Sequence, residues 1–143
     1  MRLIVHCDGA SRGNPGPAAA GVVALTERGA IVGRLAVHLG EMTNNQAEYH
    51  AVLAAVQLAG LLRADVIDCR LDSELTVRQL NGDWKLRDPE LRVLAGRVRA
   101  ALAPEARAIF THVPRAHNAL ADRLANWALD RSQPSEGASP PPV

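Results

Sequence analysis

Four acidic side chains interrupt apolar stretches of the sequence, where an isolated carboxylate is costly to bury. Asp8 and Asp72 each follow a short apolar run, LIVHC and CRL respectively. Glu48 falls on the apolar row of a helical repeat, and Asp122 lies among apolar residues near the start of the last helical repeat. Burying a carboxylate without a partner costs several kcal/mol. We therefore expect these four acids to share a binding partner.

A divalent cation is the partner that suits clustered carboxylates. Carboxylates held close together repel one another and raise one another's pKa values. The set offers only hard oxygen ligands, and no histidine or cysteine lies at ligand spacing, which favours Mg²⁺ or Mn²⁺ over zinc. The pattern therefore predicts a magnesium or manganese site.

Each acid also has a structural explanation of its own. Asp72 could cap the helix that follows it, and Asp122 could be an exposed acid favoured by the helix dipole. Asp8 could be a turn residue, and Glu48 could be a partly exposed residue near a helix start. The coincidence of all four acids argues for the metal site.

Hydrophobic periodicity and turn residues predict nine elements that would position these acids. Strands are predicted at residues 2–8, 19–25, 31–39, 66–72 and 107–113. Helices are predicted at residues 44–59, 73–80, 88–102 and 118–130. Asn44 or Asn45 can cap the first helix, and Gly60 is placed to end it. The DPE sequence at residues 88–90 is typical of a helix start.

The element order β-β-β-α-β-α-α-β-α predicts an α/β fold with a five-stranded mixed sheet flanked by helices. Three antiparallel strands joined by hairpins would be extended by two parallel strands that arrive through right-handed helical crossovers. The strands at 66–72 and 107–113 would then lie beside the first strand. Sites in open α/β sheets form at the carboxyl ends of strands, where Asp8 and Asp72 are expected.

The overall composition is typical of a globular protein. Its 143 residues suit one domain, placed at residues 1–131, and 48% of them are hydrophobic, which is enough for a core. The net charge of +1 gives no overall electrostatic signature for nucleic acid. Cys7 and Cys69 lie in strand-like runs and are expected in the core.

The two ends of the chain lead to further expectations. The N-terminal region does not resemble a signal peptide, and the sequence contains no long apolar stretch. We therefore expect a cytoplasmic protein without a membrane partner. Residues 132–143 are rich in proline and serine, so they are expected to form a disordered tail or the start of a linker.

Four motifs together resemble type 1 ribonuclease H over roughly residues 1–130. They are DGASRGNPGPAAAG, TNNQAEYHAVLAA, LDSELTVRQLNG and NALADRLANWAL, in the order and spacing of that family. The resemblance implies a ribonuclease H-like fold and an endonuclease that hydrolyses the RNA strand of RNA/DNA hybrids, leaving 5′-phosphate and 3′-hydroxyl ends. It also implies two Mg²⁺ ions, replaceable by Mn²⁺. The implied catalytic and metal-binding residues are Asp8, Glu48, Asp72 and Asp122.

The resemblance also assigns polar residues to the substrate. The residues expected to bind it are Asn14, Thr43, Asn44, Asn45 and Asn118. Neutral amides and hydroxyls both donate to and accept from a 2′-hydroxyl, which distinguishes RNA from DNA. Asn44 and Asn45 could serve as helix caps, and the two roles can coexist. His117 is the nearest candidate for the catalytic histidine that helps product leave in many members, whereas His112 is expected to be structural.

Two departures from the family pattern bear on function. Many members carry an extra basic helix and loop after the segment that matches TVRQLNGDWK, whereas here DWKLRDPELRVL runs directly into the next helix. In this respect the sequence resembles the short form of the family, for which weaker hybrid binding is expected. Trp84 is expected to cap the core rather than to contact the DNA backbone. The loop VPRAHNALAD before the last acid is also shortened, and short-loop relatives work without a histidine there.

Other interpretations stay open at this point. A domain of this fold could hold nucleic acid without cutting it, although such a domain would be expected to lack one or more of the four acids. Cleavage could extend to RNA/RNA duplexes. A sugar-kinase-like ATPase would need two lobes, for which 143 residues are too few. The protein is expected to be a monomer, and a C-terminal fused domain could follow the tail, as in some short-loop relatives.

Overall fold

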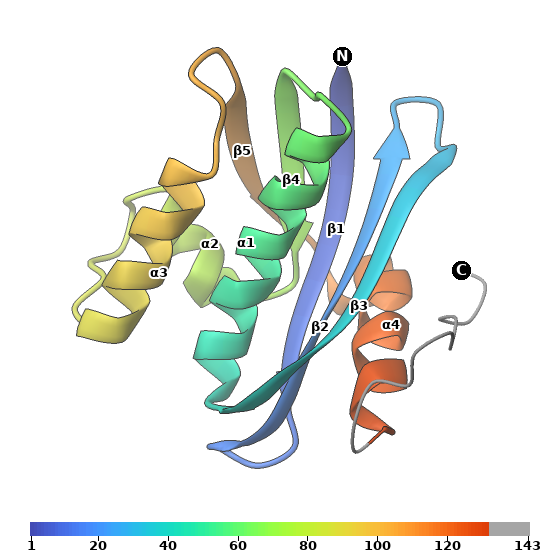
Figure 1. Ribbon diagram of the computed structural model, residues 1–143. Coiled ribbons are helices and arrows are strands. Elements are labelled where there is room, and N and C mark those ends of the chain that lie inside the picture. The colour runs from blue at the N-terminus through green and yellow to red at the C-terminus, as the bar shows by residue number, and fades with distance from the viewer. Residues whose placement is uncertain (132–143) are drawn as a thin grey trace.

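The computed structural model describes residues 1–131, so the tail predicted at residues 132–143 lies outside the described residues. Five strands form one sheet in the order β3-β2-β1-β4-β5 (Figure 1). The strands are β1 Arg2–Ser11, β2 Gly16–Thr26, β3 Ile31–Met42, β4 Val66–Leu71 and β5 Arg107–His112. The first three strands pair antiparallel, whereas β4 and β5 are added in parallel. The predicted α/β fold with a mixed five-stranded sheet is confirmed.

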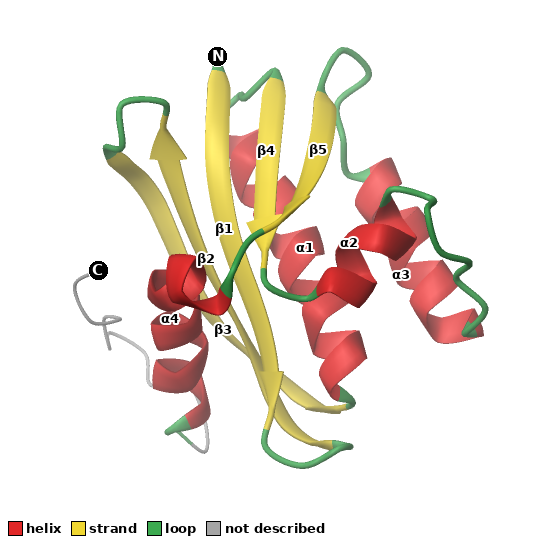
Figure 2. Cartoon of the chain, turned by 180° about the vertical axis from the view of Figure 1, so that it is seen from behind, coloured by secondary structure: helices red, strands yellow, loops and turns green. Residues whose placement is uncertain are grey.

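Helices cover both faces of the sheet. They are α1 Asn44–Leu61, α2 Glu74–Leu80, α3 Pro89–Ala100 and α4 Ala119–Leu129, with a short 3-10 helix, η1 Arg115–Asn118, directly before α4. α1 lies on one face with α3 beside it, and α4 lies on the opposite face over β2 (Figure 1 and Figure 2). Within residues 1–131, no helix is long and apolar enough to cross a membrane. The predicted element order is confirmed, with η1 as an addition.

The main core lies between α1 and the sheet. Leu3, Val5 and Cys7 are fully buried there, because alternate residues of a strand point to the same face. The Sγ atoms of Cys7 and Cys69 are 3.7 Å apart, and both cysteines are buried and free, as predicted. Burial of this apolar surface fixes α1 against the strands that carry the acids.

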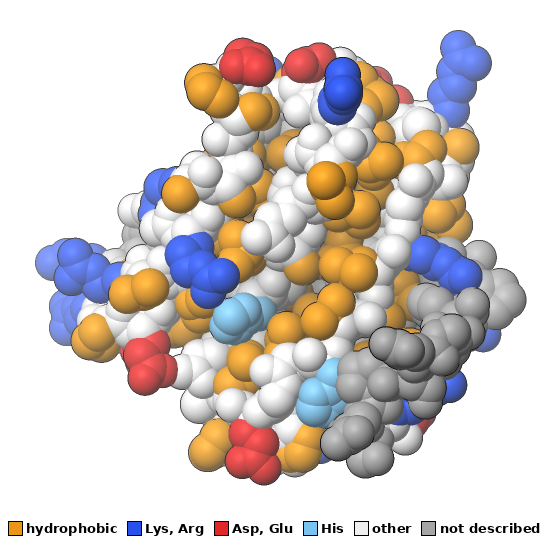
Figure 3. All heavy atoms as spheres, in the orientation of Figure 1, with side chains coloured by type: hydrophobic (Ala, Val, Ile, Leu, Met, Phe, Trp, Pro, Cys, Tyr) orange, Lys and Arg blue, Asp and Glu red, His pale blue; other side chains and the backbone are white. Residues whose placement is uncertain are grey.

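Charged side chains of both signs are visible on the face of the molecule drawn in Figure 3. On the face seen in Figure 3, Lys and Arg side chains cluster over α3, while Asp and Glu side chains lie near the two ends of the molecule. The last turn of α3 carries Arg97 and Arg99, which suit the negative end of the helix dipole. This distribution agrees with the small net charge of +1.

β1 is longer than predicted, and its length determines the environment of the acids. The strand continues past Asp8 to Ser11, because its pairing with β2 extends that far. Asp8 therefore lies inside a strand and not at its end. β1 pairs with β4 only as far as His6 and Arg70. The two strands thus part just before Asp8 and Asp72, which leaves space beside β1 for a side chain from another element.

The ends of α1 also differ from the prediction. Thr43 is the N-cap: its hydroxyl accepts from the Gln46 backbone N–H, and the Gln46 side chain accepts from the Thr43 N–H. This capping box satisfies two backbone donors at once. The prediction that Asn44 or Asn45 caps the helix is therefore wrong, and both are helical residues. The helix also continues past Gly60 to Leu61. The residue with left-handed backbone is Arg63, in the turn that follows the helix.

Candidate active site

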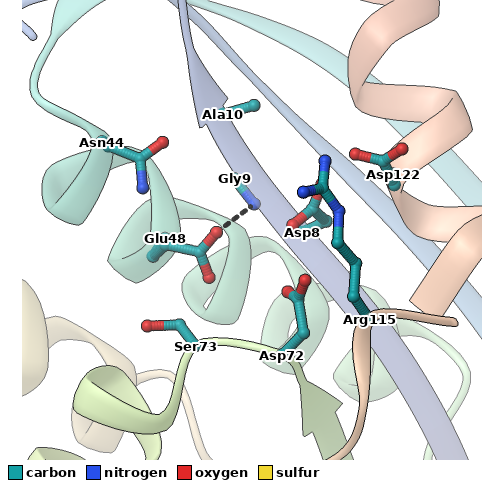
Figure 4. A pocket seen from close by; sticks show the side chains of 9 residues that line it. All are labelled: Asp8, Gly9, Ala10, Asn44, Glu48, Asp72, Ser73, Arg115 and Asp122. Atoms are coloured by element: carbon teal, nitrogen blue, oxygen red, sulfur yellow. Dashed lines mark hydrogen bonds between the residues drawn. The ribbon is translucent and has the colours of Figure 1, made fainter. Parts of the chain in front are cut away.

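Three carboxylates converge where β1 and β4 part. Asp8 comes from β1, Glu48 from the beginning of α1 and Asp72 from the residue that follows β4. Each offers an oxygen atom, and these atoms all lie within 4.8 Å of one another. They line an open pocket of about 330 Å³ (Figure 4). The structure thus brings three of the four predicted acids into one group.

Glu48 reaches this group through the space that β4 leaves beside β1. Its Oε1 atom accepts a buried hydrogen bond of 3.1 Å from the backbone N–H of Gly9. α1 lies so close to β1 that a Cβ atom on Gly9 would stand 2.1 Å from the carbonyl oxygen of Ala47. Only glycine permits this approach, so Gly9 sets the position of Glu48.

Burial and mutual repulsion disfavour the charged forms of Asp8 and Glu48. Burial, followed by the charges of Glu48 and Asp72, raises the pKa of Asp8 to about 9. Burial also raises the pKa of Glu48 to about 8, although the N–H of Gly9 opposes the rise. The Oε2 atom of Glu48 is buried without a hydrogen-bond partner in the described part of the chain. An orphaned carboxylate oxygen beside two further carboxylates fits a divalent cation.

Asp122 lines the same pocket from α4, but it stands outside the group of three carboxylates (Figure 4). It lies in the first turn of α4, where its Oδ1 atom accepts from Nδ2 of Asn126 at 3.2 Å. Its charge adds to the rise in the pKa of Asp8. α4 comes this close because it packs on Gly21, where a Cβ atom would stand 2.0 Å from the carbonyl oxygen of Ala121.

Asn118 lies behind the site, with only 1% of its surface exposed. Its Nδ2 atom donates to the carbonyl oxygen of Cys7 at 2.9 Å and to Oδ1 of Asp72 at 3.4 Å. In this structure the Asn118 amide supports Asp72, and its predicted contact with substrate stays a prediction. His117 is exposed and does not line the pocket, so its catalytic role stays a prediction.

The other predicted substrate residues gather at the beginning of α1. Oδ1 of Asn14 accepts from the backbone N–H of Asn44 at 3.0 Å, which joins the β1–β2 loop to the helix. Asn44 lines the carboxylate pocket. A further pocket of about 560 Å³ is lined by Asn14, Thr43, Asn45, Gln46, Asp88, Pro89, Glu90 and Leu91. These residues thus lie near the beginning of α1, and their contact with substrate stays a prediction.

Arg115 is a pocket residue that the sequence did not single out. It belongs to η1, and its side chain reaches toward Asp8 and Asp122 (Figure 4). Ser73, the N-cap of α2, also lines the pocket. The sequence feature that could have indicated Arg115 is its position: it is a basic residue in the short loop that leads to Asp122. A guanidinium at this position could bind a phosphate oxygen.

Trp84 lies on the surface, and the prediction that it caps the core is wrong. Trp84 is 45% exposed, and the guanidinium of Arg78 lies 5.9 Å from the centroid of its ring. Residues 81–88 between α2 and α3 form turns and extended chain without a helix. This short segment agrees with the predicted absence of the basic helix.

Comparisons with known proteins agree with this architecture. A family model described as reverse transcriptase-like matches residues 6–128. Ribonuclease HI of Halobacterium salinarum is 48% identical over 129 residues, which make up 90% of this chain and 65% of that protein. The chain thus spans 65% of the length of this relative.

Solved structures give the same result. The crystal structure of RNase H1 from Halobacterium salinarum matches with a TM-score of 0.87 and 48% identity, covering 91% of this chain and 98% of that chain. The structure of LC11-RNase H1 in complex with an RNA/DNA hybrid matches with a TM-score of 0.84 and 36% identity, covering 90% and 96% of the two chains. This chain therefore belongs to the type 1 ribonuclease H family.

Proposed function

We propose that the protein is a divalent-cation-dependent ribonuclease H that hydrolyses the RNA strand of RNA/DNA hybrids. The observation that carries the proposal is the group formed by the buried Asp8 and Glu48 and the partly buried Asp72, with an unpartnered Oε2 atom on Glu48, at the wall of an open pocket. Membership of the family supports the reaction, and the hybrid bound to LC11-RNase H1 supports the substrate class.

The carboxylates divide into two roles under this proposal. Asp8, Glu48 and Asp72 would hold the cations, for which we propose two Mg²⁺ ions with Mn²⁺ as a substitute, and Asp122 would contribute from the opposite wall. Bound cations supply charge for a phosphate oxygen and lower the pKa of a bound water. The protein itself contributes position, because Gly9 fixes Glu48 by a hydrogen bond of 3.1 Å and Asn118 supports Asp72.

Arg115 supplies the positive side chain of the pocket. Its guanidinium is planar and carries several donors, so it can bind a phosphate oxygen beside Asp8 and Asp122. We therefore assign Arg115 to the phosphate of the RNA strand. The hydrolysis is proposed to leave a 5′-phosphate and a 3′-hydroxyl.

The amides at the beginning of α1 suit the RNA strand of the hybrid. Asn44 and Asn45 are exposed there, so their side chains are free to donate to and accept from a 2′-hydroxyl. The neighbouring pocket also carries Asp88 and Glu90. These acids repel a phosphate backbone, and the segment at 81–88 has no helix that would offset them. A short hybrid footprint with modest affinity follows.

The test is cleavage of a labelled RNA/DNA hybrid with Mg²⁺ or Mn²⁺, beside matched RNA/RNA and DNA/DNA duplexes. We expect internal cuts in the RNA strand of the hybrid, bearing 5′-phosphate ends, that disappear with EDTA and in Asp72→Asn. Asp83→Asn is the matched control, because Asp83 is exposed and does not line the pocket. Equal cutting of RNA/RNA would widen the substrate class. A folded protein that binds hybrid without cutting it would contradict the proposal and favour a binding module.

A further inference from the structure

A chain of three polar side chains runs behind the carboxylate group, from His6 through Asn118 to Asp72. The Nδ1 atom of His6 lies 3.3 Å from Oδ1 of Asn118. Nδ2 of Asn118 donates to Oδ1 of Asp72 at 3.4 Å and to the carbonyl oxygen of Cys7 at 2.9 Å. Asn118 is buried, with 1% of its surface exposed, so the protein must satisfy its amide without solvent.

The hydrogen-bonding chemistry of these groups fixes the direction of the chain. The backbone carbonyl oxygen of Cys7 can only accept, so the amide nitrogen of Asn118 must face it. The amide oxygen therefore faces His6, and Nδ1 of His6 must carry the hydrogen that it donates. With the imidazole in this tautomer, each member of the chain has a donor opposite an acceptor.

His6 is well placed to act on the site without touching the substrate. It forms the last register pair between β1 and β4, opposite Arg70, directly before the two strands part. It also shares a strand face with Asp8, two residues later in β1. Its side chain is partly buried and does not line the carboxylate pocket. Its influence on the site therefore passes through Asn118.

We propose that His6 is a positioning residue, which holds the amide of Asn118 so that its nitrogen faces Asp72 and keeps that carboxylate turned toward Asp8 and Glu48. The proposal rests on the proposed function, since it assigns Asp72 to cation binding. Without the donor at position 6, the amide oxygen of Asn118 is left buried without its partner, and only the contacts of the amide nitrogen hold the side chain. The side chain would then shift to bring its oxygen to another donor, and the hydrogen bond of 3.4 Å that supports Asp72 would be weakened.

The first test measures cation binding without substrate, by following the free Mn²⁺ signal in electron paramagnetic resonance. His6→Phe keeps an aromatic ring but lacks the donor, so we expect Mn²⁺ affinity to fall by about tenfold, the size typical of lost support behind a metal ligand. His6→Asn places an amide nitrogen close to the position of Nδ1, so it should restore most of the affinity. His112→Phe is the control, because His112 is exposed on β5 and does not line the pocket.

The same variants separate positioning from a general loss of structure. On a hybrid substrate, His6→Phe should lower kcat and leave KM for the hybrid unchanged, and His6→Asn should recover kcat. In the unmodified protein, ¹⁵N–¹H correlation spectra of the imidazole should show the Nδ1–H form of His6. This last measurement needs neither a variant nor activity.

Three results would overturn the inference: an Nε2–H form of His6, undiminished Mn²⁺ affinity in His6→Phe, or His6→Asn behaving like His6→Phe. Failure of the proposed function gives a different pattern. In that case the unmodified protein would not cut hybrid, while the imidazole form and the dependence of Mn²⁺ affinity on position 6 would still be observed.

Discussion

Gly9 and Ala47 are in such close contact that a Cβ atom on Gly9 would stand 2.1 Å from the carbonyl oxygen of Ala47. The contact presses the first turn of α1 onto β1 at the point where β4 has ended. The backbone N–H of Gly9 is thereby left to Glu48, whose Oε1 atom accepts it at 3.1 Å. One glycine thus links the packing of the helix to the position of a proposed cation ligand.

Replacing Gly9 with alanine should damage both stability and cation binding. The added methyl group has no room, so α1 must move away from β1, at a cost of roughly 1–3 kcal/mol in the free energy of unfolding. Movement of α1 carries Glu48 with it. We expect Gly9→Ala to lower the thermal unfolding temperature and to reduce the rise in that temperature when Mn²⁺ is added.

Gly96→Ala is the matched control for this prediction. Gly96 lies within α3, and a Cβ atom there would meet nothing within 4 Å. Alanine is the better helix former by about 1 kcal/mol, so this variant should be at least as stable as the unmodified protein. Equal stability and Mn²⁺ response in Gly9→Ala would show that α1 does not depend on the close contact.

The cation-free protein should lose stability as the pH rises through the neutral range. Asp8 and Glu48 have folded-state pKa values of about 9 and about 8, above the ordinary values of 3.8 and 4.5. Between these limits the folded state binds more protons than the unfolded state, so the free energy of unfolding falls with increasing pH. Each group contributes a slope of at most about 1.4 kcal/mol per pH unit.

The measurement is urea denaturation with EDTA between about pH 7.5 and pH 9. Burial lowers the pKa of His6 and of His50 in the folded protein, so the unfolded chain binds more protons at these two residues near their ordinary pKa of 6.5, and the window is placed above that value. Asp8→Asn removes one titrating group, so its slope should be shallower. Added Mn²⁺ should cancel or reverse the trend, since the cation binds the deprotonated carboxylates. A flat or rising profile with EDTA would contradict the assigned pKa directions.

The sequence predicted those features of the fold that depend on the regular spacing of apolar residues. Element order, sheet type and the burial of Glu48 follow from apolar spacing, because a buried face recurs at a fixed interval along a helix or strand. Strand ends do not follow from such spacing. β1 continues past Asp8 because β2 pairs with it as far as Ser11, and that pairing depends on residues distant in the sequence.

The sequence predicted which acids form the site, but it did not predict how they are arranged in space. Nothing in the spacing of Asp122 shows that it stands outside the group of three carboxylates, because its reach depends on how closely α4 packs on Gly21. The resemblance assigned Asn118 to the substrate, whereas its burial and its hydrogen bond to Asp72 could not be deduced from a loop sequence. Arg115 was missed because a single arginine in a short loop has no periodic signal.

Arg115 should be needed for turnover more than for folding. It lines the carboxylate pocket and reaches toward Asp8 and Asp122 (Figure 4). A charge-assisted hydrogen bond to phosphate is worth about 1.5–3 kcal/mol, so Arg115→Ala should lower kcat/KM on hybrid by roughly 10-fold to 100-fold. Arg123→Ala, at an exposed position on α4 that does not line the pocket, should retain full activity.

Steady-state kinetics and the unfolding temperature, measured on the same samples, check this prediction. The unfolding temperature of Arg115→Ala should stay close to that of the unmodified protein, because Arg115 is exposed. Arg115→Lys should recover part of the activity, since it restores the charge without the planar fork. Unchanged kcat/KM in Arg115→Ala would remove Arg115 from the proposed phosphate contact.

Trp84 should contribute little to stability and more to hybrid binding. It is 45% exposed and covered on one side by Arg78, so Trp84→Ala should change the free energy of unfolding by roughly 0.5–1 kcal/mol. Loss of a buried tryptophan would cost about 3–5 kcal/mol instead. An exposed indole offers a flat surface on which a sugar or base of the proposed substrate can stack, so we expect hybrid binding to weaken measurably.

Fluorescence separates these two roles. Trp127 lies partly buried beside Arg131, whose guanidinium is 3.7 Å from the ring centroid. Acrylamide should therefore quench Trp84 more strongly than Trp127, and bound hybrid should protect Trp84. The protection should persist in Trp127→Phe and vanish in Trp84→Ala. The prediction would be contradicted if hybrid protected neither tryptophan and Trp84→Ala bound hybrid as tightly as the unmodified protein. The indole of Trp84 would then play no part in hybrid binding.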